Sequence, residues 1–124
     1  MTTSRLVEQR IRNRLFEYVE WVVEAERVPP DLGMNELLNQ WEDFVRRPVE
    51  AETFPAPVFT EPEVEALKTL DSAWERICSA TPSTVLDERA TMSTPAWRDF
   101  VAAAKATALV FGARGRLSED VELA

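Results

Sequence analysis

The feature of this sequence that most restricts its fold is a set of four stretches in which apolar residues recur every three or four positions. This spacing places them on one side of an α-helix, which has 3.6 residues per turn. Prolines, which cannot continue a helix, separate the stretches. Only three glycines occur, which argues against a turn-rich β-sandwich, and no strand pattern or internal repeat is evident. The sequence therefore predicts an all-α single domain over 1–124, arranged like a four-helix bundle.

Capping and breaking residues set the expected helix ends. The helices are expected over about 4–27, 35–47, 60–81 and 94–112. The expected N-cap residues are Ser4, Asn35, Thr60 and Thr94. Thr60 and Glu63 have the spacing of a capping box, which gives the third helix the clearest start. Residues 83–93 are polar, and for them we expect at most one short helical turn.

Two further segments fall outside these helices. Residues 49–60 contain two prolines, which predict an extended connection between the second and third helices. Phe54, Val58 and Phe59 make this connection too apolar for a free linker, so we expect it to cover part of the core. The tail over 116–124 is acidic and is expected to fray.

Charge and composition exclude several classes of protein. The net charge of −8 argues against a nucleic-acid binder and against binding to an anionic membrane surface. No segment approaches the roughly 20 apolar residues of a membrane span, and the N-terminal residues do not resemble a signal peptide. The single cysteine, Cys78, cannot form an internal disulfide and is compatible with a reducing compartment. We therefore expect a cytoplasmic protein.

The chain contains no histidine, which removes the usual general base and the common zinc and di-iron motifs. Cys78 is expected near a helix C-terminus, where the helix dipole disfavours a thiolate. The carboxylate pairs Glu61/Glu65 and Asp71/Glu75 could hold a hard cation, but such pairs are more often a solvated acidic face. We expect no metal and no cofactor. A metal- or Arg-assisted enzyme without histidine is the least favoured alternative.

The first helix carries its charges against its own dipole. Residues 5–14 contain four arginines and one glutamate, whereas 17–27 contain four glutamates and one arginine. The apolar surface of this helix is also wider than one core contact requires. Two copies placed antiparallel across a two-fold axis would bring basic halves against acidic halves, which predicts a homodimer. The predicted dimer-binding residues are Arg10, Arg14, Phe16, Glu17, Glu20, Val23 and Glu24.

The function favoured by these features is that of a small acidic domain that binds and masks a protein partner. An inhibitor, an immunity protein or an antitoxin against a basic target would fit, because an acidic face attracts a cationic one. The candidate acidic surfaces are Glu61, Glu63 and Glu65, and the face formed by Glu17, Glu20 and Glu24.

The alternative is a helical bundle that binds a small molecule. Each expected helix carries one tryptophan, and aromatic rings can wall an apolar pocket between helices. The candidate pocket residues are Trp21, Trp41, Trp74 and Trp97. Trp21 lies at the edge of its apolar stripe, whereas the other three lie on their stripes and also suit a plain core role.

Overall fold

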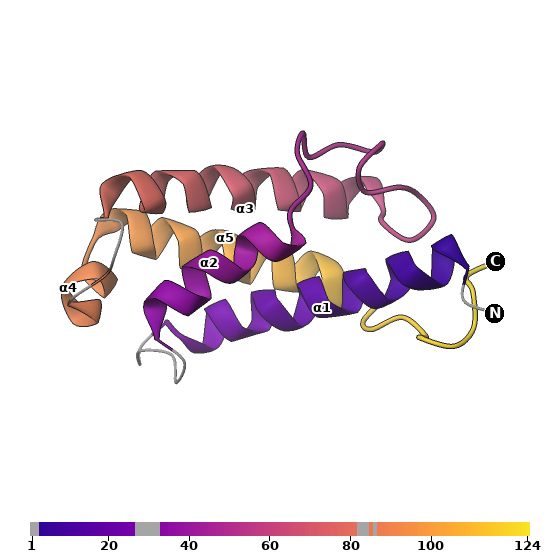
Figure 1. Ribbon diagram of the computed structural model, residues 1–124, viewed down its shortest axis with the longest axis horizontal. Coiled ribbons are helices and arrows are strands. Elements are labelled where there is room, and N and C mark those ends of the chain that lie inside the picture. The colour runs from indigo at the N-terminus through magenta and orange to yellow at the C-terminus, as the bar shows by residue number, and fades with distance from the viewer. Residues whose placement is uncertain (1–2, 27–32, 82–84, 86) are drawn as a thin grey trace.

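The computed structural model describes residues 3–26, 33–81, 85 and 87–124, and it confirms the all-α class (Figure 1). The helices are α1 (Ser4–Glu24), α2 (Met34–Phe44), α3 (Glu61–Ala80), α4 (Glu88–Met92) and α5 (Pro95–Gly112). Helix α5 lies between α1 and α3, and α2 packs on α1 across the front of this layer. The short α4 contacts the start of the bundle's central helix, α5. Within the described residues, no helix combines the length and apolarity needed to cross a membrane.

The capping residues explain where the helices begin. The predicted capping box at α3 is confirmed, with Thr60 and Glu63 each bonding to the other's backbone N–H. Thr94 caps α5 as predicted. The predictions for the first two helices were wrong: Thr3 caps α1, and Gly33 precedes α2. Asn35 instead exchanges two hydrogen bonds with the backbone of Val85, at 2.8 and 3.2 Å.

The connection between α2 and α3 covers the core, as predicted. It passes through two turns, closed by bonds from Phe54 N–H to the Glu50 carbonyl and from Phe59 N–H to the Pro55 carbonyl. The rings of Phe54 and Phe59 meet edge to face at 5.1 Å. Both side chains and Val58 are buried. Each such burial stabilises the fold by roughly 1.5–3 kcal/mol, so the connection is part of the core rather than a linker.

A buried charge cluster holds this end of the bundle together. Glu63 is 1 % exposed and Arg12 is fully buried, and their side chains meet at 2.8 Å. Arg114 donates to the other oxygen of Glu63 at 2.8 Å. Arg12 also donates to the carbonyl of Phe111, in the last turn of α5, and to the carbonyl of Gly115 just beyond this helix. One carboxylate therefore connects α1, α3 and the end of α5.

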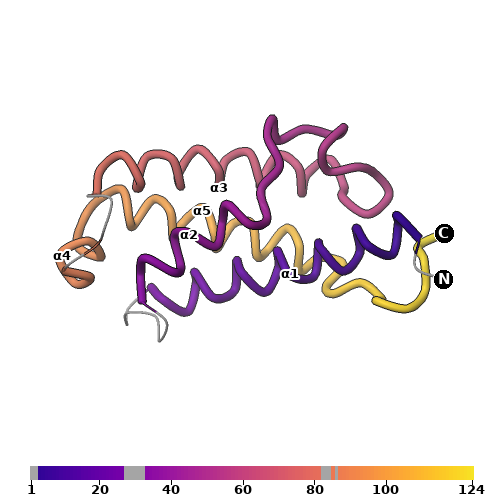
Figure 2. The backbone as a smooth tube through the Cα atoms, in the orientation of Figure 1, coloured from indigo at the N-terminus to yellow at the C-terminus, as the bar shows by residue number. Residues whose placement is uncertain are grey.

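The C-terminal segment runs back along the first half of α1 rather than fraying (Figure 2). Gln9, which is fully buried, donates to the carbonyls of Ser118 and Val121 and accepts from the Leu123 N–H. Asn13 exchanges hydrogen bonds with the backbone of Leu117. Buried side-chain amides need such partners, because an unpaired one costs free energy. The segment thus pairs a polar face of α1 that helical periodicity did not assign to the core.

Removing this segment should destabilise the domain. A chain that ends at Leu117 loses the partners of Gln9 and the bonds from Arg5 and Arg10 to carbonyls of the segment. With a net value of about 0.5–1.5 kcal/mol per hydrogen bond, we expect the free energy of unfolding to fall by roughly 2–4 kcal/mol. Urea denaturation of the truncated and full-length chains measures this difference.

The control variant keeps the C-terminal segment and removes two of its negative charges. Asp120→Asn combined with Glu122→Gln should change the free energy of unfolding by less than about 0.5 kcal/mol, because the bonds to α1 come mainly from the segment's backbone. Equal stability of the truncated and full-length chains would contradict the role assigned to the segment.

Candidate functional site

A groove lies between the connection and the first half of α3. Its cavity volume is about 430 Å³. It is lined by Glu50, Ala51, Phe54, Ala56, Phe59, Glu61, Val64, Glu65 and Lys68. The apolar lining includes the buried rings of the connection, and the acidic side chains come from both elements. The groove exists because the connection turns back onto α3 instead of leaving the bundle.

Three carboxylates dominate the charge of this groove. Among the described residues, no cation pairs with Glu50 or Glu61. Glu65 lies 3.4 Å from the ammonium of Lys68, and both of these side chains are at least half exposed. Such an exposed pair contributes little and exchanges readily with another cation. The groove therefore carries a net negative charge that the chain itself compensates only in part.

Glu63 fixes the position of the groove from beneath. Its carboxylate accepts the Thr60 N–H at 3.1 Å, and Arg114 donates both to this carboxylate and to the carbonyls of Pro57 and Val58. Burial raises the pKa of Glu63, but the bonds from Arg12, Arg114 and Thr60 outweigh this effect and hold the pKa below its usual range. The carboxylate is thus ionised, and it ties the end of the connection to the first turn of α3.

This arrangement suits a basic side chain with an apolar stem. An Arg or Lys can lay its methylene groups against the apolar lining while its charged head reaches carboxylates at the rim. Arginine adds bidentate hydrogen bonds to carboxylates. The shape and charge of the groove therefore suit a cationic residue.

The predicted acidic surface around α3 divides into two parts. Glu61 and Glu65 line the groove and are exposed. Glu63 is buried in the charge cluster and is not available to a partner, so its assignment to the surface was wrong. The cause is the capping box, which turns this side chain back toward the N-terminus of its own helix.

The residues predicted to bind a second copy lie along the C-terminal segment. Arg10 donates to the carbonyl of Glu119, and Arg14 pairs with the carboxylate of Glu119. Arg116 pairs with Glu17 and Glu20, both at 2.9 Å. The split charge of α1 therefore has intrachain partners of opposite sign.

The remaining members of the predicted dimer face differ in exposure. Phe16 is 8 % exposed, packs on Phe111 and has the Arg116 guanidinium 5.6 Å from its ring centroid. Val23 is half-buried against the core, and Glu24 is exposed. Arg14, Glu17 and Glu20 already have ionic partners within the chain, so α1 presents fewer unpaired charges to a second copy than its sequence indicates. The homodimer stays a prediction.

The four tryptophans do not surround one pocket. Trp41 is fully buried and donates to Asp71 at 2.8 Å, and Trp74 donates to the Leu38 carbonyl at 2.8 Å. Trp21 packs edge to face on Tyr18, at 6.3 Å between ring centroids. These three rings join α1, α2 and α3. Trp97 lines a cavity near α4 and the start of α5.

The remaining candidates for chemistry have structural surroundings. Asp71 is buried and accepts bonds from Trp41 and Arg47, so Asp71 and Glu75 do not form an open pair of acids. Burial, with a contribution from Glu42, raises the pKa of Cys78 to about 11, so its thiol is neutral near pH 7. Within the described ranges, no three acidic or thiol side chains come together as metal ligands would.

Sequence reasoning did not identify Glu50 as a site residue, nor Gln9, Arg12 and Asn13 as buried. Glu50 enters the groove only because the connection folds back on α3. The three residues of α1 are polar, and hydrophobic periodicity assigns polar residues to solvent. In the sequence, the groove is indicated only by an acidic residue, Glu50, that stands four positions before an aromatic one, Phe54.

Comparison of the chain with family models, with curated proteins and with solved structures finds no significant match in any of the three.

Neutralising Glu63 should destabilise the domain strongly. Glu63→Gln leaves the buried Arg12 without its counter-charge, and breaking a buried pair in this way typically costs about 3–5 kcal/mol. The matched control is Glu65→Gln on the exposed face of the same helix, with an expected change below about 0.5 kcal/mol. Urea denaturation at pH 7 measures both.

The pH dependence provides a second check. The pKa of Glu63 is lower in the folded than in the unfolded chain. Its stabilising contribution is therefore full above the unfolded value of about 4.3 and is lost as the pH falls through the lower folded value. The stability difference between wild type and Glu63→Gln should shrink in that acid range. A difference that is constant from pH 7 to pH 3 would contradict this account.

Proposed function

We propose that this domain binds a basic protein partner through the acidic groove between the connection and α3. The observation that supports the proposal is the placement of Glu50, Glu61 and Glu65 around apolar side chains in one cavity. Acidic residues scattered over a surface would favour solubility alone. Carboxylates that converge on a concave apolar surface instead suit a cationic side chain that inserts between them.

The net charge of the chain supports the same proposal. A charge of −8 attracts a basic partner over a distance, which raises the rate of encounter at low salt. The groove then provides the short-range contacts. The finer assignment, that the partner is masked by an inhibitor, immunity or antitoxin type of domain, rests on this charge and on the absence of a catalytic arrangement among the described residues.

Two charge-matched variants test the groove. The groove variant combines Glu50→Gln, Glu61→Gln and Glu65→Gln. The control variant combines Glu36→Gln, Asp43→Asn and Asp120→Asn, which are exposed acids outside the groove. Each variant removes three negative charges. A difference in partner binding between the two variants therefore reports the position of the charges rather than the net charge.

Affinity capture from a lysate of the source cells at low salt, with identification by mass spectrometry, is the readout. We expect wild type and control to retain the same basic protein and the groove variant to lose it. For the isolated partner, we expect the groove variant to bind at least about tenfold more weakly, because charge-assisted hydrogen bonds contribute about 1.5–3 kcal/mol each. Equal loss in both variants would mean that only net charge matters, and would overturn the proposal for this groove.

The homodimer through α1 is a separate proposal with its own test. Sedimentation velocity at tens of micromolar distinguishes a dimer of 14.1 kDa chains from a monomer. A dimer that uses α1 must break or share the pairs that Arg116 forms with Glu17 and Glu20, so Arg116→Gln should strengthen its self-association. A monomer in both cases would exclude it.

A further inference from the structure

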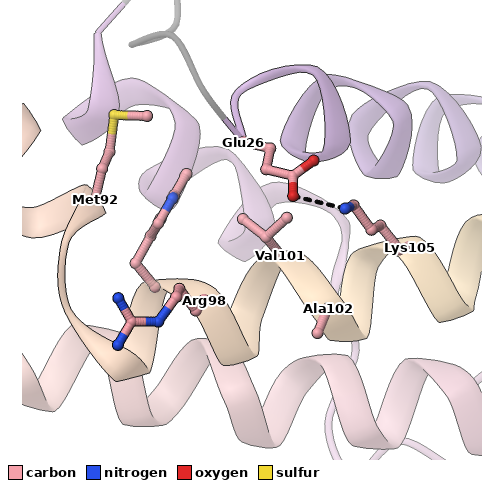
Figure 3. A pocket seen from close by; sticks show the side chains of 7 residues that line it. Glu26, Met92, Arg98, Val101, Ala102 and Lys105 are labelled. Atoms are coloured by element: carbon pink, nitrogen blue, oxygen red, sulfur yellow. Dashed lines mark hydrogen bonds and ion pairs between the residues drawn. The ribbon is translucent and has the colours of Figure 1, made fainter.

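A second cavity lies at the opposite end of the bundle, where α4 and the start of α5 approach the end of α1. Its volume is about 340 Å³. It is lined by Glu26, Met92, Trp97, Arg98, Val101, Ala102 and Lys105 (Figure 3). Arg98, Ala102 and Lys105 are spaced at i, i+4 and i+7, so they share one face of α5. This volume is at the small end of the range for ligand pockets.

The cavity wall contains a hydrogen-bond donor that has no acceptor. Trp97 is 1 % exposed, and its indole Nε1 is buried without a partner among the described residues. The other buried indole, that of Trp41, donates to Asp71. Buried donors are nearly always paired, because an unpaired one carries a desolvation cost. Trp97 lines this cavity, so its indole N–H signal can report a ligand that packs against the ring.

The charged side chains of the cavity are held in place. Arg98 donates one hydrogen bond to the Ser93 carbonyl at 3.0 Å, and Lys105 donates to Glu26 at 2.6 Å. In Figure 3, Arg98 and the Glu26–Lys105 pair lie on either side of Val101. Each cation retains further donor positions beyond these bonds. The cavity thus has two cations and one anion, although the chain as a whole is strongly acidic.

Met92, Val101 and Ala102 supply an apolar lining beside these donors. Methionine is flexible and polarisable, so it adapts to apolar groups of irregular shape. A ligand that satisfies the whole cavity needs an anionic acceptor group and a compact apolar group. Fully polar anions leave the apolar lining without a contact, and neutral apolar molecules leave Arg98 and Lys105 without an anionic partner.

We propose that this cavity binds a small carboxylate whose carboxylate group is attached to a compact apolar group. The carboxylate accepts hydrogen bonds from Arg98 and Lys105, and the apolar group packs on Met92 and Val101. The site is independent of the acidic groove, because the two cavities share no lining residue.

The indole N–H signals of the protein provide a direct readout. Phenylacetate is the probe, and 2-phenylethanol and acetate are its neutral and its purely polar counterparts. In ¹H–¹⁵N spectra, with the Trp97 signal assigned through Trp97→Phe, we expect phenylacetate to shift that signal saturably. The signals of Trp41 and Trp74 should move little, because their donors already have partners within the chain.

Two variants link the shift to the cavity. Arg98→Gln with Lys105→Gln should raise the Kd of phenylacetate at least about tenfold. The reason is that each lost hydrogen bond between a cation and the carboxylate lowers the affinity by about this factor. Arg76→Gln with Arg5→Gln removes the same charge from exposed positions outside both cavities and should leave binding unchanged. Ala102→Leu fills the cavity without a change of charge and should also abolish the shift, which covers the case in which the first variant fails to fold.

The opposite results would overturn the proposal. These are the absence of a saturable shift with phenylacetate, an equal response to 2-phenylethanol or to acetate, and an unchanged response in a folded Arg98/Lys105 variant or in Ala102→Leu.

Discussion

The ionised carboxylate of Glu63 is the interaction on which the arrangement of one end of this bundle depends. A buried charge is tolerated only when it is paired and hydrogen-bonded, because removing it from water is costly. Glu63 meets this requirement with two arginines from distant parts of the chain and with the N–H of its own helix cap. Arg12 in turn donates to carbonyls in the last turn of α5 and just beyond it. Glu63 and Arg12 therefore cap α3 and connect it to α1 and to the end of α5.

The reversed charges of α1 have a related explanation. Exposed charges placed against a helix dipole cost only about 0.3–1 kcal/mol each, so core burial can outweigh them. In the folded chain they also have partners, because the C-terminal segment places Arg116 beside the acidic half of α1 and Glu119 beside the basic half. The charge pattern that suggested a second copy of the helix is thus matched within one chain. The segment covers polar side chains of α1 with its backbone, and its Leu117 and Leu123 pack against the core.

The two cavities give the ends of the molecule opposite chemical character. At one end, acids surround the aromatic side chains of the connection, and at the other, cations and an unpaired indole N–H lie beside methionine and valine. The charged groups of each cavity come mainly from one helix, so helical spacing fixes their separation. The neighbouring elements, the connection in one case and α4 with the end of α1 in the other, supply the opposite wall. A partner at one end and a small ligand at the other would therefore not compete for the same residues.

The sequence by itself determined the helical class, the start of α3 and of α5, and the role of 49–60 as a cover for the core. These features depend on local rules: apolar spacing, a capping box, a threonine before proline, and the need to bury phenylalanine. Only the tertiary structure decided which polar residues are buried, because Gln9, Arg12 and Asn13 find their partners about a hundred residues away. It also decided that Glu63 belongs to the interior, that Glu50 joins the groove, and that Trp97 lines the cavity at the opposite end of the bundle. Burial of a polar group depends on a partner brought close by folding, and neither periodicity nor composition contains that information.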